Sequence, residues 1–481
     1  MTPRQIADIG VARLGLPVPT GKLVTIQALA QALANPQTAY VFEEAVLEWI
    51  GTRELESECL EALCALALAQ VRPEMISRVR RVIPQPSLAS DVLVSLASGN
   101  PTVLPSWSGC HAGPAPQLLD LRGEEKALRA GTFIPPAFAH ALERLEESSG
   151  RPLVRQWAFE FSVLRERVSS STDGHFEYFL GRQRENVAQF VARQGHLARS
   201  SYLRTLACAV ERWGMPQHLA VDYALLALPA EPLFLKLAPG DAPPWAGSLH
   251  ERTYEESDVK EELVRDSLQL AEVAGNRRVM HLSAAIGDAP LCHVELTVFA
   301  VVCAEGLPNA KHALGFYDHM LGNLTPARDS LRAFVCPDLG LEGTEELGFV
   351  PTVLPLIGAN VGYLQTDFVG RIPYVPLASA SLPQLEMAPG VGGAQLTSQG
   401  VPVGEFACWY WNWQPSHPRG WPSPIGCCST LTREAADRLE ADLGGRIQHV
   451  WKLTTWTRQT EYGEWARAKH VGVLSSGPPH H

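Results

Sequence analysis

The hydrophobic period of the chain changes across one proline-rich segment, residues 229–247, and this change limits the possible folds more than any other feature. The segment holds five prolines and two glycines. Because prolines remove backbone donors and glycines favour turns, we predict a linker without any regular element. Apolar residues recur at helical spacing before it, and after one further helix they alternate as in strands. The pattern predicts two domains, residues 1–228 and 248–481, and an α+β fold class.

The first domain is predicted to be entirely helical. Ile26, Leu29, Ala30 and Leu33 share one helix face, and similar apolar groups recur through the first hundred residues. Short polar breaks separate them, which is typical of a bundle or an irregular stack of helical pairs. No fixed repeat period is present, so a regular solenoid is not expected. A loop rich in proline and glycine at 100–117 is a possible boundary within this domain.

The second domain is predicted to hold a mixed or antiparallel sheet with helices. Strand-like runs at 278–286 and 291–303 flank a turn sequence, which indicates a hairpin. Thr432 is a suitable N-cap for a helix at 433–443, because its hydroxyl can accept a hydrogen bond from a free backbone amide. A strand at 446–458 follows. The glycine-rich stretch 389–395 lacks a complete dinucleotide-binding fingerprint and is expected to be a loop.

The most distinctive stretch for function lies near the C-terminus. Three tryptophans alternate along a predicted strand at positions 409, 411 and 413. A loop rich in proline and glycine follows and carries His417, Arg419 and Trp421. Such rows of aromatic residues build either a core or a binding surface. The binding interpretation predicts that a ligand or partner contacts Trp409, Trp411, Trp413, Arg419 and Trp421.

The same loop suggests one catalytic hypothesis. His417 could act as a base for the thiol of Cys427 or Cys428, since an imidazole lowers the pKa of a neighbouring thiol. Arg419 would then bind an anionic group of a substrate. The ten cysteines show no zinc-like spacing, so we predict no metal, and no motif indicates a cofactor.

Arginines interleaved with aromatic residues between 182 and 213 suggest a further hypothesis. Arg182, Arg184, Arg193 and Arg199 could clamp a nucleic-acid backbone. Nearby glutamates balance much of this charge, however, and a solvated helix face predicts the same residues.

The overall composition excludes several classes of protein. A formal net charge of −11 argues against general attraction to nucleic acid or to anionic membranes. The N-terminus lacks the features of a secretory signal, and no apolar run is long enough to span a membrane. Scattered cysteines without an export signal are typical of a reducing compartment, so we expect a soluble cytoplasmic protein.

The sequence predicts function by class alone. A stretch at 15–23 departs from a phosphate-binding loop, and no familiar hydrolase or kinase motif is present. We expect a non-catalytic interaction or regulatory protein, or a sensor, that acts through protein–protein contacts. In layout it is similar to adaptor and sensor subunits of bacterial conflict and phage-defence (antiviral) systems. A cysteine/histidine-dependent hydrolase or transferase, and a nucleic-acid-binding protein, are the alternatives.

Overall fold

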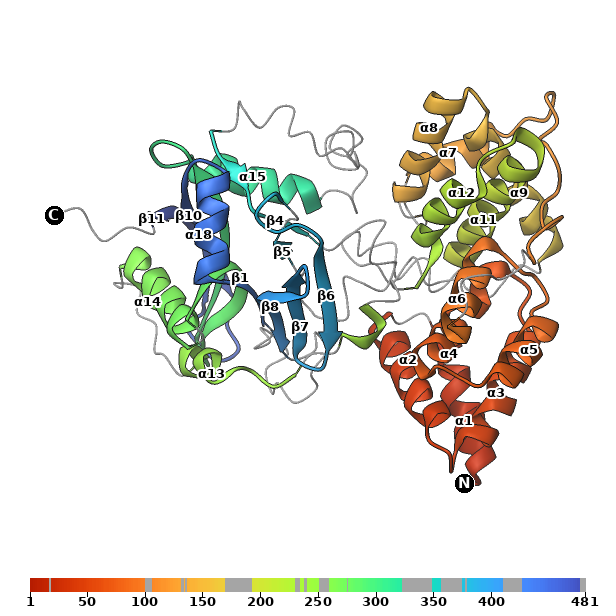
Figure 1. The fold of residues 1–481 in the computed structure, drawn as a ribbon, viewed down its shortest axis with the longest axis horizontal. Helices are drawn as coiled ribbons and strands as arrows, with labels where there is room; N and C mark the ends of the chain where they lie inside the picture. The colour runs from red at the N-terminus through yellow and green to blue at the C-terminus, as the bar shows by residue number, and fades with distance from the viewer. Residues whose placement is uncertain are drawn as a thin grey trace. The chain divides into compact units, whose positions relative to one another are not determined.

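The computed structural model confirms the α+β class. It describes residues 1–16, 19–99, 106–130, 134, 136–168, 193–229, 234–237, 240–250, 259–274, 276–321, 348–355, 374–376, 379–409 and 426–475. These residues form two compact units, a helical unit up to Lys236 and an α+β unit from Leu237 onward (Figure 1). The division falls inside the proline-rich segment 229–247. Within the described residues, no helix has the length and apolar character needed to cross a membrane.

The helical unit begins with a well-formed cap. The Thr2 hydroxyl accepts a hydrogen bond from the Gln5 amide, and the Gln5 side chain accepts one from the Thr2 amide. Pro3 occupies the first helical position, where its missing amide costs nothing. The described helices of this unit are α1 (Pro3–Ala12), η1 (Arg13–Gly15), α2 (Pro19–Ala34), α3 (Ala39–Gly51), η2 (Glu56–Cys59), α4 (Leu60–Ala69), α5 (Pro73–Val82), α6 (Leu88–Ser98), α7 (Arg122–Ala130), α8 (Pro136–Ser149), α9 (Leu153–Arg167), α11 (Arg193–Trp213), α12 (Gln217–Ala224), η4 (Leu225–Ala227) and η5 (Phe234–Lys236).

The first six helices stack as pairs in two rows. Helix α1 packs against α3 and α3 against α5, while α2 packs against α4 and α4 against α6. Each helix therefore contacts the helix two positions along the chain, as successive pairs do when they stack. Of the two predicted arrangements, this is the helical-pair stack.

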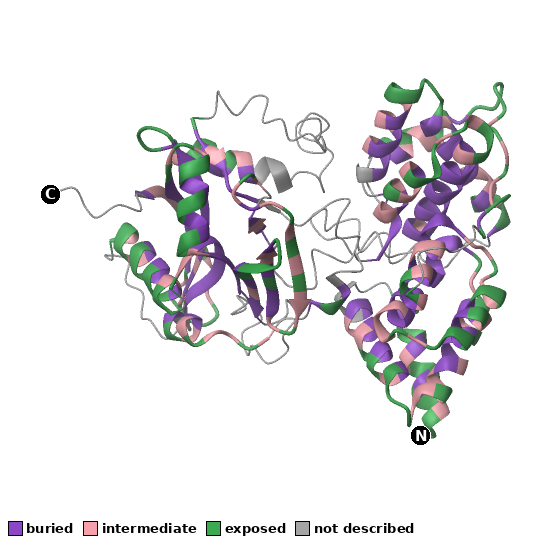
Figure 2. Ribbon diagram, in the orientation of Figure 1, coloured by how far each residue is buried: buried purple, intermediate pink, exposed green. Residues whose placement is uncertain are grey.

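The remaining helices pack around α11. Helices α7, α8 and α9 contact one another, α9 lies against α11, and α12 contacts both α11 and α6. Every residue of α11 from Gly195 to Ala209 is buried, so this helix forms the centre of the unit (Figure 2).

The α+β unit is built on a nine-stranded sheet in the described part of the chain, with the order β11-β10-β2-β1-β9-β8-β7-β6 and with β3 paired to β2. Its strand pairs are antiparallel. Strands β4 and β5 form a separate pair. The elements are α13 (Pro244–His250), α14 (Lys260–Val273), β1 (Arg277–Ala289), β2 (Cys292–Cys303), α15 (Ala310–Leu321), β3 (Val350–Pro351), β4 (Val353–Pro355), β5 (Tyr374–Pro376), β6 (Leu385–Gly390), β7 (Gly393–Ser398), β8 (Val401–Trp409), β9 (Gly426–Thr432), α18 (Arg433–Asp442), β10 (Arg446–Thr457) and β11 (Ala466–Ser475).

Helices cover both faces of this sheet. Apolar residues of α13 and α14 form one core with one face, and residues of α15 and α18 form a second core with the other. Both faces of the central strands are therefore buried, and β9 is buried at six successive positions. The predicted hairpin is confirmed as β1 and β2, and Thr432 caps α18 by accepting a hydrogen bond from the Ala435 amide at 3.2 Å.

Two local predictions were wrong. Regular structure does occur within 229–247, because η5 lies there and α13 begins at Pro244, where proline suits the first helical turn. The stretch 389–395 belongs largely to the antiparallel pair β6 and β7. Its glycines serve the turn: Gly392 has φ +84°, and a Cβ on Gly393 would lie 1.9 Å from the carbonyl oxygen of Phe406.

Candidate functional site

The row formed by α1, α3 and α5 places charged residues opposite its buried face. In α5, Met75, Ile76 and Val79 are buried, while Arg78 and Arg81 are three residues apart and share the outer side. In α3, Glu44 and Glu48 are four residues apart and likewise lie on one side. Helix amphipathicity therefore brings acidic and basic side chains together on adjacent helices.

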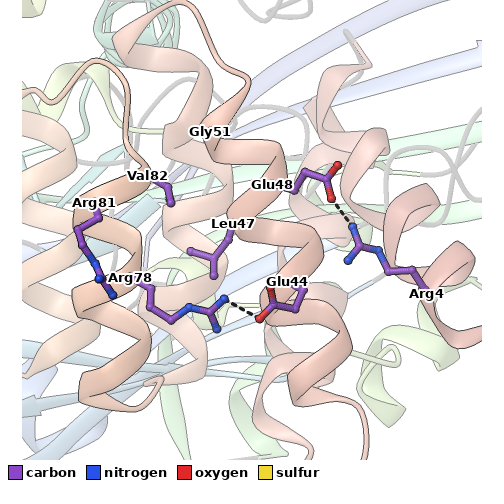
Figure 3. Close-up of a pocket in the computed structure, with 8 residues that line it drawn as sticks. All are labelled: Arg4, Glu44, Leu47, Glu48, Gly51, Arg78, Arg81 and Val82. Atoms are coloured by element: carbon purple, nitrogen blue, oxygen red, sulfur yellow. Dashed lines mark hydrogen bonds and ion pairs between the residues drawn. The ribbon is translucent and has the colours of Figure 1, made fainter.

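These side chains line a groove of about 580 Å³ on the helical unit (Figure 3). Its lining residues come from three helices and are Arg4, Glu44, Leu47, Glu48, Gly51, Arg78, Arg81 and Val82. Leu47 and Val82 contribute apolar surface, and Gly51 adds no side chain. The groove thus combines an apolar strip with charged walls.

Two ion pairs occupy the walls of the groove. Arg78 donates to Glu44 at 2.6 Å, and Arg4 pairs with Glu48 and also with Asp8 at 2.7 Å. Arg81 differs, because its Nε donates to the carbonyl oxygen of Ser77 at 3.2 Å and no carboxylate of the described chain lies within ion-pair distance. The groove therefore carries three guanidinium groups and two carboxylates.

A smaller hollow of about 240 Å³ lies beside the groove, between α1 and α3. Glu48 lines both, and the other lining residues are Asp8, Val11, Ala45, Trp49 and Thr52. The Arg53 guanidinium stacks on Trp49 at 3.8 Å from the ring centroid, which orients the indole. The surface of this helix row is therefore indented on both sides of Glu48.

A second cluster of reactive side chains lies inside the helical unit. His196 Nδ1 is 3.0 Å from Ser57 Oγ, and His196 Nε2 is 3.7 Å from Glu61 Oε1. The order serine, histidine, carboxylate matches that of a nucleophilic triad. However, Ser57 is completely buried and donates its only hydroxyl hydrogen to the carbonyl oxygen of His196 at 2.8 Å. This geometry supports packing of η2 against α11 rather than attack on a substrate.

The same region holds several buried ion pairs. Lys22 of α2 pairs with Glu61 at 3.0 Å, and Arg204 pairs with Glu56 at 2.5 Å. Burial raises the pKa of Glu56 against the opposing effect of Arg204. Burial is also the main reason that the pKa of His196 lies well below its usual value, and nearby cations add to the effect. These contacts join helices that are far apart in the sequence.

In the sheet, the predicted site residues that the structure describes are buried. Trp409 is fully buried and meets Trp245 edge to face at 5.6 Å, as part of the core on the α13 and α14 side. Cys428 belongs to the same core, whereas Cys427, its neighbour on β9, points to the other face. Burial raises the pKa of Cys428 well above its usual value.

The remaining residues of that predicted site are Trp411, Trp413, His417, Arg419 and Trp421, and they lie outside the described residues. The pairing of His417 with Cys427 or Cys428 therefore stays a prediction. The binding role of the tryptophans and of Arg419 stays one as well.

The arginines proposed to bind nucleic acid have different surroundings. Arg182 and Arg184 lie outside the described residues. Arg193 pairs with Glu58 at 2.6 Å and also with Glu54, and Arg199 is completely buried. Of these two described arginines, Arg199 is thus directed into the protein and Arg193 is held by carboxylates of the same unit.

Comparison with family models and with curated proteins gives no relative for this chain. No family model matches it, and no curated protein resembles it closely enough to count as a match. Among the described residues, no group of three or more histidine, cysteine or acidic side chains is arranged to hold a metal ion.

The groove residues were not singled out from the sequence, although a signal was present. Charged residues at spacings of three and four mark the outer faces of α1, α3 and α5, as with Arg4 and Asp8 or Glu44 and Glu48. Such spacing indicates one helix face, but it does not tell which helices lie side by side.

Proposed function

We propose that this protein is a non-catalytic interaction or regulatory protein, and that the groove across α1, α3 and α5 binds a partner protein. The observation that carries the proposal is the groove itself, an apolar strip between charged walls in which Arg81 has no carboxylate partner in the described chain. Stacked helical pairs form extended surfaces of this kind, and helical-repeat proteins use such surfaces to bind partners.

The charge of the groove favours a partner segment in which an acidic residue lies near apolar residues. A carboxylate from the partner would pair with Arg81, while its apolar side chains cover Leu47 and Val82. Charged rims mainly set partner choice and association rate, whereas the apolar strip supplies affinity.

We place the protein, as part of the same proposal, among adaptor or sensor components of bacterial conflict and phage-defence systems. The support is the layout alone, a helical unit followed by an α+β unit. Deleting the gene from its own host should then raise the plating efficiency of at least one phage, and restoring it should reverse the change.

The groove is tested by site-specific photocrosslinking. A photoreactive amino acid replaces Val82 in the full chain, expressed in its own source, and the crosslinked protein is identified by mass spectrometry. The identified partner is then purified, and its affinity for the unmodified protein is measured by titration calorimetry.

Charge reversal decides whether the groove is the binding surface. We expect Arg81→Glu to lower the affinity for the partner at least about tenfold. A higher salt concentration should reduce the difference in affinity between the variant and the unmodified protein. Arg212→Glu reverses an exposed arginine on α11 and is the matched control. Equal affinities of the Arg81→Glu variant and the unmodified protein would show that the partner binds elsewhere.

A further inference from the structure

Two cysteines stand directly opposite each other in the sheet of the α+β unit. Cys408 near the end of β8 and Cys427 near the start of β9 are register partners in an antiparallel pair. Both are buried, with 1% and 0% of their surfaces exposed, and neither forms a disulfide in this structure.

The backbone hydrogen bonds of Cys408 define the type of this pair. The Cys408 amide donates to the carbonyl oxygen of Gly392 at 3.0 Å, and its carbonyl oxygen accepts from the amide of Gly240 at 3.0 Å. Both backbone groups of Cys408 therefore point away from β9. In an antiparallel ladder, a residue oriented in this way forms a non-hydrogen-bonded pair with its partner, and such pairs bring the side chains closest together.

This geometry suits a disulfide. A non-hydrogen-bonded pair has a Cα–Cα distance of about 4.5 Å, and disulfides span Cα distances of about 4.4–6.8 Å. Side chains of directly opposed residues also leave the strand on the same face, so both sulfur atoms lie on one side of the sheet. No shift of register is needed to join them.

The neighbouring thiol of Cys428 cannot take the place of Cys427. Strand alternation directs Cys428 to the opposite face, where it packs in the core with Trp409. Its register partner on β8 is Ala407, which has no sulfur. The pairing is therefore specific to Cys408 and Cys427.

We propose that Cys408 and Cys427 are a redox modification site, which forms a cross-strand disulfide when the protein meets a peroxide. One thiol first attacks hydrogen peroxide, the O–O bond breaks, and one water leaves as the sulfur becomes a sulfenic acid. The second sulfur then displaces the hydroxyl group, which leaves as a second water. The two thiols lose two electrons and peroxide gains them, so the step balances.

Oxidation at this site is expected to be slow at neutral pH and faster in alkaline solution. Burial raises the pKa of Cys408, and the adjacent Cys427 raises it further. Because the thiolate is the attacking form, the rate should increase with pH in the native protein. The product would link the strands that precede and follow residues 410–425.

The test is mass spectrometry of the full chain after treatment with hydrogen peroxide under native conditions. We expect the mass of the chain to decrease by about 2 Da, because two hydrogen atoms are lost, and we expect a disulfide-linked peptide pair that contains Cys408 and Cys427. The unfolding temperature of the α+β unit should rise by several degrees and return after reduction, because the link limits the unfolded chain.

Matched variants make the result specific. Cys427→Ser should abolish the linked peptide pair, and Cys428→Ser should keep it, although both replace a buried thiol on β9. Circular dichroism confirms that each variant is folded, and Cys427→Ala replaces Cys427→Ser if the latter is not. Oxidation of the half-buried Cys110 or Cys292 without a 408–427 link would overturn the proposal. A link that forms only in denaturant would also overturn it.

Discussion

Lys22 carries its charge on a side chain that is 1% exposed, and its ion pair with Glu61 is equally buried. Its ammonium also donates to the carbonyl oxygen of Leu14. A buried ion pair gains little over an apolar pair of the same size, but loss of one partner leaves a charge without compensation. The contribution of Lys22 to stability is therefore largest when Lys22 is substituted and Glu61 is kept.

We predict that Lys22→Met lowers the free energy of unfolding by about 3–5 kcal/mol, because Glu61 would remain buried without its cation. The double variant Lys22→Met/Glu61→Leu should recover most of this loss. Urea unfolding followed by circular dichroism measures both, and Lys126→Met, at an exposed site on α7, is the control. Equal losses in the single and double variants would contradict the prediction.

The pH dependence of stability gives a second prediction at this scale. His196 faces Glu61, Arg199, Lys22 and Arg193, and burial is the main reason that its pKa lies well below the usual histidine value of about 6.5. The unfolded chain therefore takes up a proton as the pH falls through 6.5, while the folded protein does not. Stability that is present above pH 6.5 should be lost below it, by up to about 1.4 kcal/mol per pH unit.

The measurement compares unfolding free energies of the unmodified protein and His196→Gln between pH 7.5 and about 5. Burial also raises the pKa of Glu56 and of Glu160, which gives the opposite slope in acid, but both groups are present in both proteins. The difference between the two curves isolates His196. Parallel curves would show that His196 does not bind its proton more weakly in the folded state.

At the scale of elements, strand β9 and helix α18 meet at a single residue. Thr432 ends β9 and caps α18, because its hydroxyl accepts a hydrogen bond from the Ala435 amide. The buried residues Ala435, Ala436 and Leu439 then place α18 on the sheet core that it shares with α15. The cap therefore fixes where the chain changes from strand to helix.

We predict that Thr432→Ala lowers the free energy of unfolding by about 1 kcal/mol, since one helix amide loses its acceptor. Thr432→Ser keeps the hydroxyl and should stay close to the unmodified protein. Thermal unfolding monitored by circular dichroism provides the comparison. If Thr432→Ser lowers the free energy of unfolding as much as Thr432→Ala does, the effect comes from the lost methyl group and not from the cap.

At the scale of the whole molecule, each compact unit contains its own apolar core. Leu206 lies on α11 at the centre of the helical unit, and Leu296 lies on β2 in a core of the α+β unit. A leucine-to-alanine change in either core costs about 2–5 kcal/mol.

We predict that Leu206→Ala raises hydrogen exchange mainly in peptides from residues 1–236, and that Leu296→Ala raises it mainly in peptides from the α+β unit. Exchange measured by mass spectrometry on the full chain distinguishes the two. A similar increase in both units from either variant would show that they unfold as one.

The sequence by itself determined the elements whose cause is local. The change of hydrophobic period predicted the α+β class, two opposed strand runs predicted the β1–β2 hairpin, and a hydroxyl before an amphipathic run predicted the α18 cap. These features depend on side chains that are close in the sequence, so the spacing of those residues is sufficient to predict them.

Only the tertiary structure decided which distant residues meet. Periodicity identifies the outer face of α3, but packing decides that Arg4 and Arg78 reach it, and only that packing makes a groove. Strand register likewise places Cys408 opposite Cys427, and no pattern in the sequence between these two residues predicts that they pair. Burial of Lys22 and Arg199 also depends on helices brought together from far along the chain, because long-range contacts set the local environment of a charge.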